Sequence, residues 1–203
     1  MTCDFKPVPC RSVKGRCAIL DVETTGLNPK ISEVLQLAIV DSVDGGVVLN
    51  DFYDVHSEEW PEAQAVNRIT KEMVRGLPFL KDEAAEVSEI LAKFDVIAGY
   101  NICFDLQFLR NAGVRIPRVP IVDLMVDYSE MKGEYVLKRW KLSQACAWAG
   151  CELLKAHDAV TDSLATLALY NKLREDFRCR HATDTTTICT LPIFTGNTGH
   201  HSL

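Results

Sequence analysis

Two carboxylates stand two positions apart in the segment 21–26, which reads Asp-Val-Glu-Thr-Thr-Gly. The apolar run before them predicts a short buried strand over 16–21, so the pair lies where this strand ends. Alternate residues of a strand point to the same side, which puts Asp21 and Glu23 together and Val22 on the other side. Two such charges repel unless protons or cations separate them, and Mg²⁺ or Mn²⁺ prefers oxygen ligands. The pattern indicates a metal site, although a strand end that is merely acidic has the same letters.

A third carboxylate follows a predicted strand over 95–100. The chain there reads Asn101-Ile-Cys-Phe104-Asp105 and continues into a predicted helix over 104–111. Asp105 falls in the first helical turn, at the edge of the sheet, where it is a second candidate ligand. In the alternative interpretation, the Asp105 carboxylate only stabilises the helix N-terminus, which contributes about 0.3–1 kcal/mol. Asn101 can likewise be no more than the N-cap.

The last candidate group is the run from His157 to Asp162, which leads into a long helix predicted over about 158–175. If both residues were helical, five steps of about 100° would separate their side chains by about 140°. They converge instead if His157 lies in the loop before the helix and Asp162 lies on its first turns. Histidine titrates near neutrality and suits proton transfer, whereas a plain surface loop histidine fits the same letters. Asp158, beside it, is expected to cap the helix.

The elements that must position these groups are strands first, followed by alternating strands and helices. Together with the strand over 16–21, apolar runs predict strands over 34–40 and 47–55 with a hairpin turn at Asp44-Gly45-Gly46 between them, a helix over 82–94, a short strand over 119–122 and a helix over 142–149. This order predicts an α/β fold, with a mixed sheet flanked by helices.

The composition fits one globular domain in a chain of 203 residues, with 47% hydrophobic and 25% charged residues. The net charge of −6 argues against a protein that coats duplex nucleic acid, because that mode requires a basic face. No signal peptide or membrane segment is predicted, and the scattered cysteines favour free thiols in a reducing cytoplasm. The chain therefore divides into an N-terminal leader (1–15), a domain (16–176) and a flexible or partner-ordered tail (177–203).

Taken in this order, the three acidic groups resemble the motifs of the DEDDh exonucleases, the histidine-containing branch of the RNase T/DnaQ-like family. That family includes the proofreading subunit of bacterial DNA polymerase III. The resemblance runs from about Arg16 to Arg174 and takes in the segment 65–73, which is similar to the family's segment between its first two motifs. It implies an α/β, ribonuclease H-like fold with a mixed five-stranded sheet flanked by helices.

The resemblance also implies a site. Its position in the motifs makes Asp21, Glu23, Asp105 and Asp162 the ligands of two Mg²⁺ or Mn²⁺ ions, and His157 the general base. Family members release nucleoside 5′-monophosphates from a 3′ end. The expected function is thus a metal-dependent 3′→5′ exonuclease on single-stranded DNA ends. An RNA-trimming enzyme and a non-catalytic exonuclease-fold subunit are the alternatives.

Substrate contacts are expected beside the motifs. Thr24 and Thr25 offer donors to the terminal nucleotide, Gly26 permits the turn, and Leu27 can pack against the base. Phe104 is expected to pack there too, and Asn101 to line the same site. A local basic surface is expected from one or more of Arg68, Lys71, Arg110, Lys138, Arg139 and Lys141.

Two pairs depart from the family pattern. Tyr100-Asn101 stands where many relatives carry His-Asn, and Asn67-Arg68 stands where many carry His-Gly. Neither pair replaces a ligand or the base, so activity is expected, and the change bears on how the terminal nucleotide is held. The tail is expected to dock a DNA polymerase, as tails do in some relatives, and the protein is expected to be a monomer or a homodimer.

Overall fold

A five-stranded mixed sheet forms the centre of the computed structural model, which describes residues 5–133, 140–151, 153 and 157–186. Its strands are β1 (Cys17–Thr24), β2 (Val34–Asp41), β3 (Val47–Phe52), β4 (Val96–Gly99) and β5 (Ile121–Asp123). They lie in the order β3-β2-β1-β4-β5. The three strands β1, β2 and β3 pair antiparallel, whereas β4 runs parallel to β1 and β5 runs parallel to β4. The predicted mixed sheet is confirmed.

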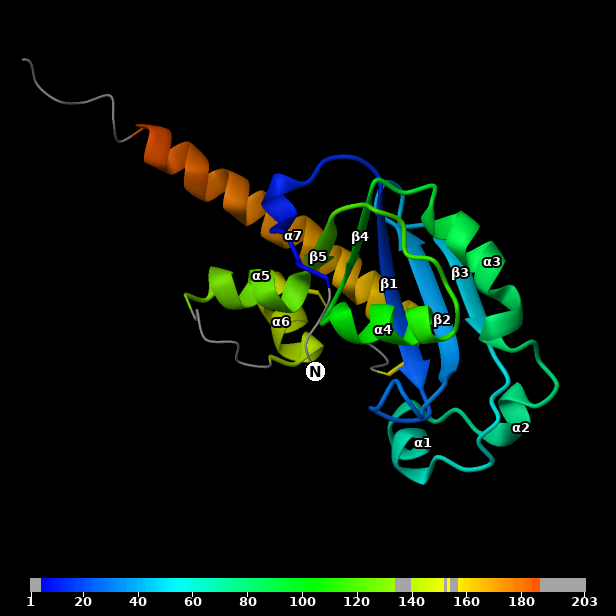
Figure 1. Ribbon diagram of the computed structural model, residues 1–203. Coiled ribbons are helices and arrows are strands. Elements are labelled where there is room, and N and C mark those ends of the chain that lie inside the picture. Colours follow the sequence, from blue (N-terminus) through cyan, green and yellow to red (C-terminus); the bar gives the residue numbers. More distant parts are fainter. Residues whose placement is uncertain (1–4, 134–139, 152, 154–156, 187–203) are drawn as a thin grey trace, which may run out of the picture.

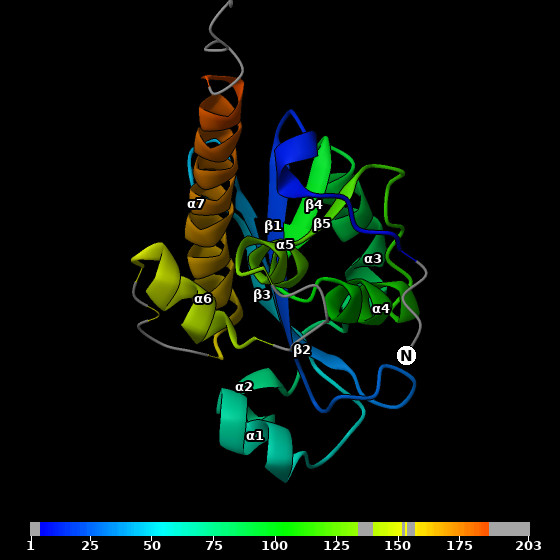
Figure 2. The ribbon, with the colours of Figure 1, turned by 90° about the vertical axis from the view of Figure 1, so that its left-hand side faces the viewer.

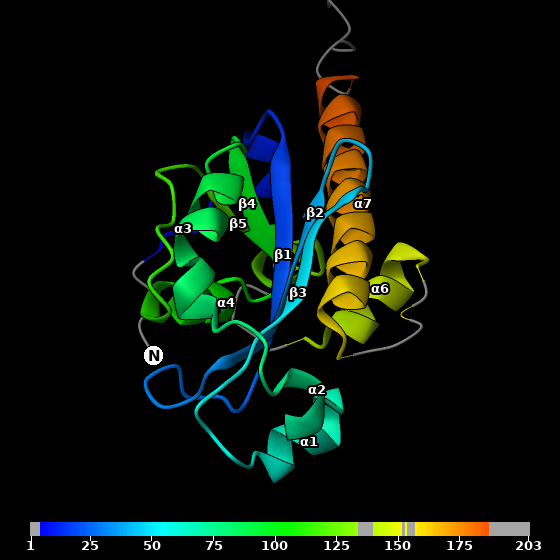
Figure 3. The same ribbon diagram turned by 90° about the vertical axis from the view of Figure 1, so that its right-hand side faces the viewer.

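Helices cover both faces of this sheet, and two further helices lie beyond one end of it. They are α1 (Pro61–Asn67), α2 (Lys71–Val74), α3 (Leu80–Leu91), α4 (Cys103–Asn111), α5 (Leu124–Met131), α6 (Leu142–Ala149) and α7 (Ala159–Thr186). Figure 1 shows the order of the strands, and α1 and α2 beyond the end of β1. In Figures 2 and 3, α7 and α6 lie on one side of the sheet and α3 and α4 on the other.

The central strand β1 is apolar on both faces because each face is covered. Ala18 and Leu20 belong to the core beneath α3 and α4, whereas Cys17 and Ile19 belong to the core beneath α5, α6 and α7. Val22 continues the first series and is buried in the α3–α4 core. Since side chains alternate along a strand, the next positions of the second series turn their carboxylates toward α7.

The structure extends β1 beyond its predicted end at residue 21, to Thr24. The reason is the partner strand, which continues to pair with β1 through Glu23 opposite Gln36 and, after a shift in register, Thr24 opposite Val34. The acidic pair therefore lies inside a paired strand rather than past its end. Both carboxylates thus start from backbone that is fixed by hydrogen bonds.

Three helices that the pattern did not predict, α1, α2 and α5, are short, with seven, four and eight residues. Helix α7 runs to Thr186, past the predicted end at 175, and no glycine or proline interrupts 176–186. The predicted tail thus begins within a helix, and its residues 187–203 lie outside the described part of the chain.

The described part of the predicted leader packs against the domain. Cys10 and Val13 are buried, and the Val8 N–H donates to the Ile121 carbonyl over 2.8 Å. Among the helices of the described residues, none combines the length and the apolar character needed to cross a membrane.

Candidate active site

A cleft of about 1030 Å³ opens where β1 ends and where α4 and α7 begin. Every residue predicted for the site lines it: Asp21, Glu23, Thr24, Thr25, Gly26, Leu27, Asn101, Phe104, Asp105, His157 and Asp162. These residues come from β1 and the loop after it, from the start of α4 and from the start of α7. The fold thus brings together three segments that are far apart in the sequence.

The acidic pair of β1 lies among other carboxylates. Burial raises the pKa of Asp21 well above its ordinary value, and the nearby charges of Asp105 and Asp162 raise it further. Burial also raises the pKa of Glu23 to about 7, with Asp162 adding to the effect. Each shift has the same physical cause, because negative charges that lie close together away from water favour the protonated form.

Asp105 reaches the pair from the first turn of α4. Its side chain is 3% exposed, and its Oδ1 accepts a hydrogen bond from the Val22 N–H over 3.1 Å. Burial raises the pKa of this carboxyl group, while the Val22 N–H lowers it. The contact joins α4 to β1 at the point between the two acidic residues, so Asp105 does more than stabilise its own helix.

Asn101 has a backbone role that differs from the N-cap interpretation. The N-cap position of α4 is Ile102, and Asn101 has a left-handed backbone with φ 61°. Its N–H donates to the buried carboxylate of Asp123 at the end of β5, over 3.0 Å. Tyr100, where many relatives carry histidine, donates its hydroxyl to the Trp140 carbonyl over 2.9 Å.

His157 and Asp162 converge in the way that the spacing requires. His157 lies two residues before α7, in the left-handed region with φ 69°, and Asp162 lies in the first turn of the helix. The His157 N–H donates to Asp162 Oδ2 over 3.2 Å. Glu23, His157 and Asp162 each offer one ligand atom, and these atoms lie within 4.8 Å of one another.

The chemistry of this donor set fits a hard divalent cation. Asp162 Oδ1 is buried and accepts no hydrogen bond from the described residues. Burial raises the pKa of Asp162, as it does for the three other carboxylates around it. A cation would replace the missing partner and remove the mutual repulsion, and carboxylate oxygens are the ligands that Mg²⁺ and Mn²⁺ prefer.

The loop after β1 is held by its own side chains. The Thr24 hydroxyl donates to the Gly26 carbonyl, and the Thr25 hydroxyl accepts from the Glu33 N–H, so both hydroxyls predicted to contact substrate have partners in the loop. A Cβ on Gly26 would lie 2.8 Å from Ser32 Oγ, a hydroxyl that can rotate away. Leu27 is 83% exposed at the mouth of the cleft.

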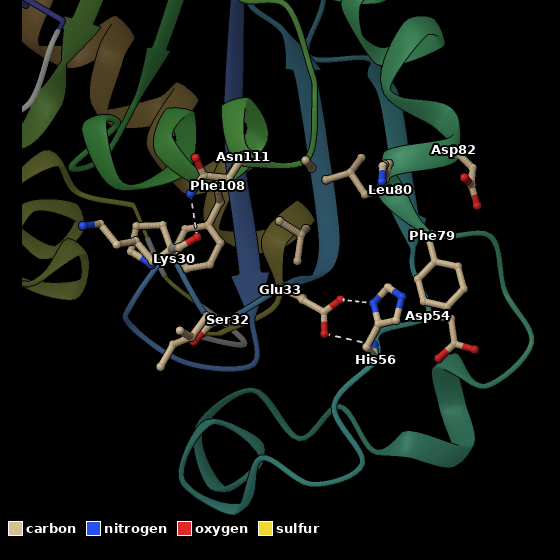
Figure 4. Close-up of a pocket in the computed structure, with 15 residues that line it drawn as sticks. Lys30, Ser32, Glu33, Asp54, His56, Phe79, Leu80, Asp82, Phe108 and Asn111 are labelled. Atoms are coloured by element: carbon tan, nitrogen blue, oxygen red, sulfur yellow. Dashed lines mark hydrogen bonds and ion pairs between the residues drawn. The ribbon is translucent and has the colours of Figure 1, made fainter.

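A second hollow, of about 810 Å³, lies behind this loop and is shown in Figure 4. In it, Glu33 accepts hydrogen bonds from the His56 ring over 2.7 Å and from the His56 N–H over 2.9 Å. Asn111, at the end of α4, donates to the Pro29 carbonyl over 2.6 Å. These contacts fix the middle of the loop that carries Leu27, at Pro29, and its last residue, Glu33.

Several cleft residues were not predicted from the sequence. They are Trp60, Pro61, Glu62, Ala63 and Val66 from α1 and the residue before it, and Met125, Trp140 and Leu142 from later segments. The unpredicted helices α1 and α5 carry most of them. A prediction of α1 from Pro at its first position and the following Glu-Ala-Gln-Ala would have found one wall.

The predicted basic surface is only partly at the cleft. Lys141 lines it, whereas Lys71 is engaged elsewhere, donating to Asp54 over 3.1 Å and to the Val55 carbonyl over 2.6 Å. Lys138 and Arg139 lie outside the described residues.

Asn67 contacts the site through its side-chain amide, and Arg68 is distinguished by its backbone conformation. Asn67 donates to the Thr24 carbonyl over 3.2 Å, and its hydrogen bond to the Glu23 carboxylate lowers the pKa of that group against the effect of burial. Arg68 adopts φ 63°, a conformation that glycine adopts without strain. The amide thus holds the end of β1, and a non-glycine residue occupies a left-handed position.

This sheet topology is that of a ribonuclease H-like fold, and four carboxylates and an imidazole line the cleft at the end of its central strand. The profile of the family described as Exonuclease (RNase T) matches residues 18–170. The chain belongs to this exonuclease family.

Curated relatives include the PolC-type DNA polymerases III of Latilactobacillus sakei and Bacillus subtilis. The first is 30% identical over 178 residues and the second 27% over 166 residues, and each match covers 78% of this chain. The chain spans 11% of the length of each polymerase.

Similar solved structures have the same fold. Exonuclease X in complex with 5′ overhanging duplex DNA has a TM-score of 0.63 at 19% identity, covering 79% of this chain and 92% of that one. Exonuclease I of E. coli in complex with a dT13 oligonucleotide has a TM-score of 0.64 at 21% identity, covering 86% of this chain and 44% of that one.

Proposed function

We propose that the domain is a divalent-metal-dependent 3′→5′ exonuclease that releases nucleoside 5′-monophosphates from single-stranded DNA ends. The observation that carries the proposal is the convergence of Glu23, His157 and Asp162, with ligand atoms within 4.8 Å, beside Asp21 and Asp105. A phosphodiester is anionic, so a cluster of bare carboxylates would repel it. The carboxylates can bind such a substrate only when cations lie between them and the phosphodiester.

Asp21, Glu23, Asp105 and Asp162 would hold two Mg²⁺ or Mn²⁺ ions. Such ions supply Lewis-acid stabilisation of the attacking and leaving oxygens. His157 would accept the proton of the attacking water at a ring nitrogen, because its side chain is exposed to the cleft and lies beside two of these carboxylates.

The remaining site residues would orient the strand. Leu27 and Phe104 both line the cleft and would contact the terminal base. Gly26 and Asn101 also line the cleft and would contact the terminal nucleotide. Thr24 and Thr25 line it as well, and their backbone would face the terminal sugar. DNA is the proposed substrate because relatives are DNA polymerases III, and two similar solved structures are complexes with a 5′ overhanging duplex DNA and with a dT13 oligonucleotide.

A digestion of matched oligomers tests this function. We expect purified protein with Mg²⁺ to shorten a 5′-labelled single-stranded DNA stepwise, and to shorten the RNA of the same sequence more slowly. A paired end should be slower than the same end with a 3′ mismatch. Faster loss of RNA would favour the RNA-trimming alternative. No shortening with Mg²⁺ or Mn²⁺ would favour a non-catalytic subunit.

The carboxylate cluster also predicts how stability depends on pH without metal. The folded pKa of Glu23 is about 7, above its ordinary 4.5, so the folded state holds a proton that the unfolded state releases. The contribution is present below pH 4.5 and is lost as pH rises through 7. In EDTA, we expect the Tm to fall between pH 5 and pH 8.

Two comparisons check the source of this change. Mg²⁺ should raise the Tm more at pH 8 than at pH 5, and Glu23→Gln should reduce the loss of Tm in EDTA. A Tm in EDTA that is independent of pH would contradict the buried charges. Thermal unfolding followed by circular dichroism measures both.

We further propose that the domain works beside a DNA polymerase, because the relatives carry the matching segment within polymerase chains. The tail is the proposed docking segment, and the domain acts as a monomer or homodimer. Deletion of 187–203, the part of the tail that follows α7, should abolish co-elution with the replicative polymerase of the same cell. Unchanged co-elution would reject this role for the tail.

A further inference from the structure

The residue proposed as general base sits on a short stretch of backbone that needs support from elsewhere. His157 has a left-handed backbone and lies just before α7, and its own N–H contacts Asp162. We propose that Gln36, on β2, is a positioning residue that fixes this stretch and so holds His157 over the carboxylates. This inference rests on the proposed exonuclease function, and it concerns a residue that touches neither the substrate nor the reacting atoms.

Gln36 lies on the correct face of the sheet for this role. It pairs with Glu23 across the β1–β2 ladder, and directly opposed residues of an antiparallel pair project to the same side. The side chain is 1% exposed although it is polar. A buried amide is retained at little cost only when its donors and its acceptor are all used.

All three groups of the Gln36 amide are used. Its Nε2 donates to Asp158 Oδ1 over 3.0 Å and to Asn50 Oδ1 over 2.9 Å. Its Oε1 accepts from the Ala159 N–H over 3.2 Å. Two of the three bonds therefore end on the residues that immediately follow His157, across 122 and 123 positions of sequence.

Asp158 transmits this contact to the helix start. Its other oxygen, Oδ2, accepts from the Thr161 hydroxyl over 2.7 Å, and its carbonyl accepts from the Asp162 N–H over 2.9 Å. The carboxylate of Asp158, which was predicted to cap the helix, thus accepts hydrogen bonds from two side chains, Gln36 and Thr161. Both oxygens of the Asp158 carboxylate have partners, which separates Asp158 from the neighbouring Asp162 with its unpartnered oxygen.

Only an amide can make this set of contacts. A carboxylate at position 36 would accept from Ala159 but would face the Asp158 carboxylate, and a thioether would make neither bond. Either change leaves the Ala159 N–H or the Asp158 carboxylate without its partner from Gln36. The backbone at 157–159 would then shift so that the unpaired group can be hydrated. Misplacement of a catalytic group by about 1 Å can cost about 10²-fold in rate.

The test uses the full chain, with steady-state hydrolysis of a single-stranded DNA end measured well below the Tm of each variant. We expect Gln36→Met to lower kcat by about 10–100-fold with KM and calorimetric Mg²⁺ binding nearly unchanged. Gln36→Glu should lose more. The double variant Gln36→Glu/Asp158→Asn reverses the hydrogen bond between the two side chains and should recover most of the loss.

Asn50→Ala is the matched control. It removes the other partner of the same Nε2 on β3 and leaves the contacts to α7 in place, so kcat should stay near that of the wild type. Hydrogen exchange gives a readout that does not depend on activity. The peptide that covers 157–163 should exchange faster in Gln36→Met, and at the wild-type rate in the double variant.

Wild-type kcat in Gln36→Met, an equal loss in Asn50→Ala, or no recovery in the double variant would each overturn the role of Gln36. If the wild-type protein releases no nucleotide, the proposed function fails on its own. The exchange measurement then still decides whether Gln36 fixes the start of α7, and an unchanged exchange rate in Gln36→Met would reject that contact.

Discussion

Replacement of His157 by alanine is expected to lower the single-turnover rate of hydrolysis by about 10²–10⁴-fold, the usual contribution of a general base. The side chain lies beside Glu23 and Asp162 but emerges from a loop, so its loss should leave the carboxylates in place. Metal binding should therefore persist. Quenched-flow assays at saturating Mg²⁺ measure the rate, and calorimetry measures the metal.

His56 provides the matched control for this variant. It is also exposed and also contacts a carboxylate, Glu33, but it lines the hollow behind the loop rather than the cleft. His56→Ala should retain the wild-type rate. A rate near that of the wild type in His157→Ala would remove His157 from the role of base.

Replacement of Asp21 by asparagine should have the largest effect on metal-dependent activity. Asp21 lies among the charges of Asp105, Asp162 and Glu23, and it would be a metal ligand at the centre of this cluster. Loss of several kcal/mol of charge stabilisation predicts a fall in kcat of about 10³-fold or more. Divalent-ion binding should weaken in the same variant.

The same change should stabilise the metal-free protein. Because burial and neighbouring carboxylates raise the pKa of Asp21, a neutral amide removes repulsion that the folded state otherwise carries. The Tm in EDTA at pH 8 should rise while activity falls. Asp127→Asn is the control, since Asp127 is buried with a pKa raised to about 6 but accepts from the Cys10 N–H outside the cleft. Full metal binding by Asp21→Asn would contradict the assignment.

The alternation of β1 shows what the sequence could predict about the site. Asp21 and Glu23 follow four apolar residues whose burial on two faces is visible in their types alone, so the common side of the two carboxylates follows from strand geometry. The convergence of His157 with Asp162 was predictable in the same way, from the helical angle. These inferences depend only on neighbours within a few residues.

The polar contacts that support the site were not predictable by this route. The Gln36 amide, the Asn67 amide and the Asp123 carboxylate all act on residues that are distant in sequence, and their letters fit an ordinary strand, helix end or strand end. Their roles depend on strand register and on where α7 and α4 begin. Both are tertiary features.

The measurement that tests the metal-dependent exonuclease most directly is release of the 3′-terminal nucleotide from single-stranded DNA carrying a label on that nucleotide. Purified protein is titrated with Mg²⁺ against a background of EDTA. The expected result is no release in EDTA, release that rises with Mg²⁺, and a product that co-migrates with the nucleoside 5′-monophosphate. Release in EDTA at the same rate, a 3′-monophosphate product, or no release with either Mg²⁺ or Mn²⁺ would contradict it.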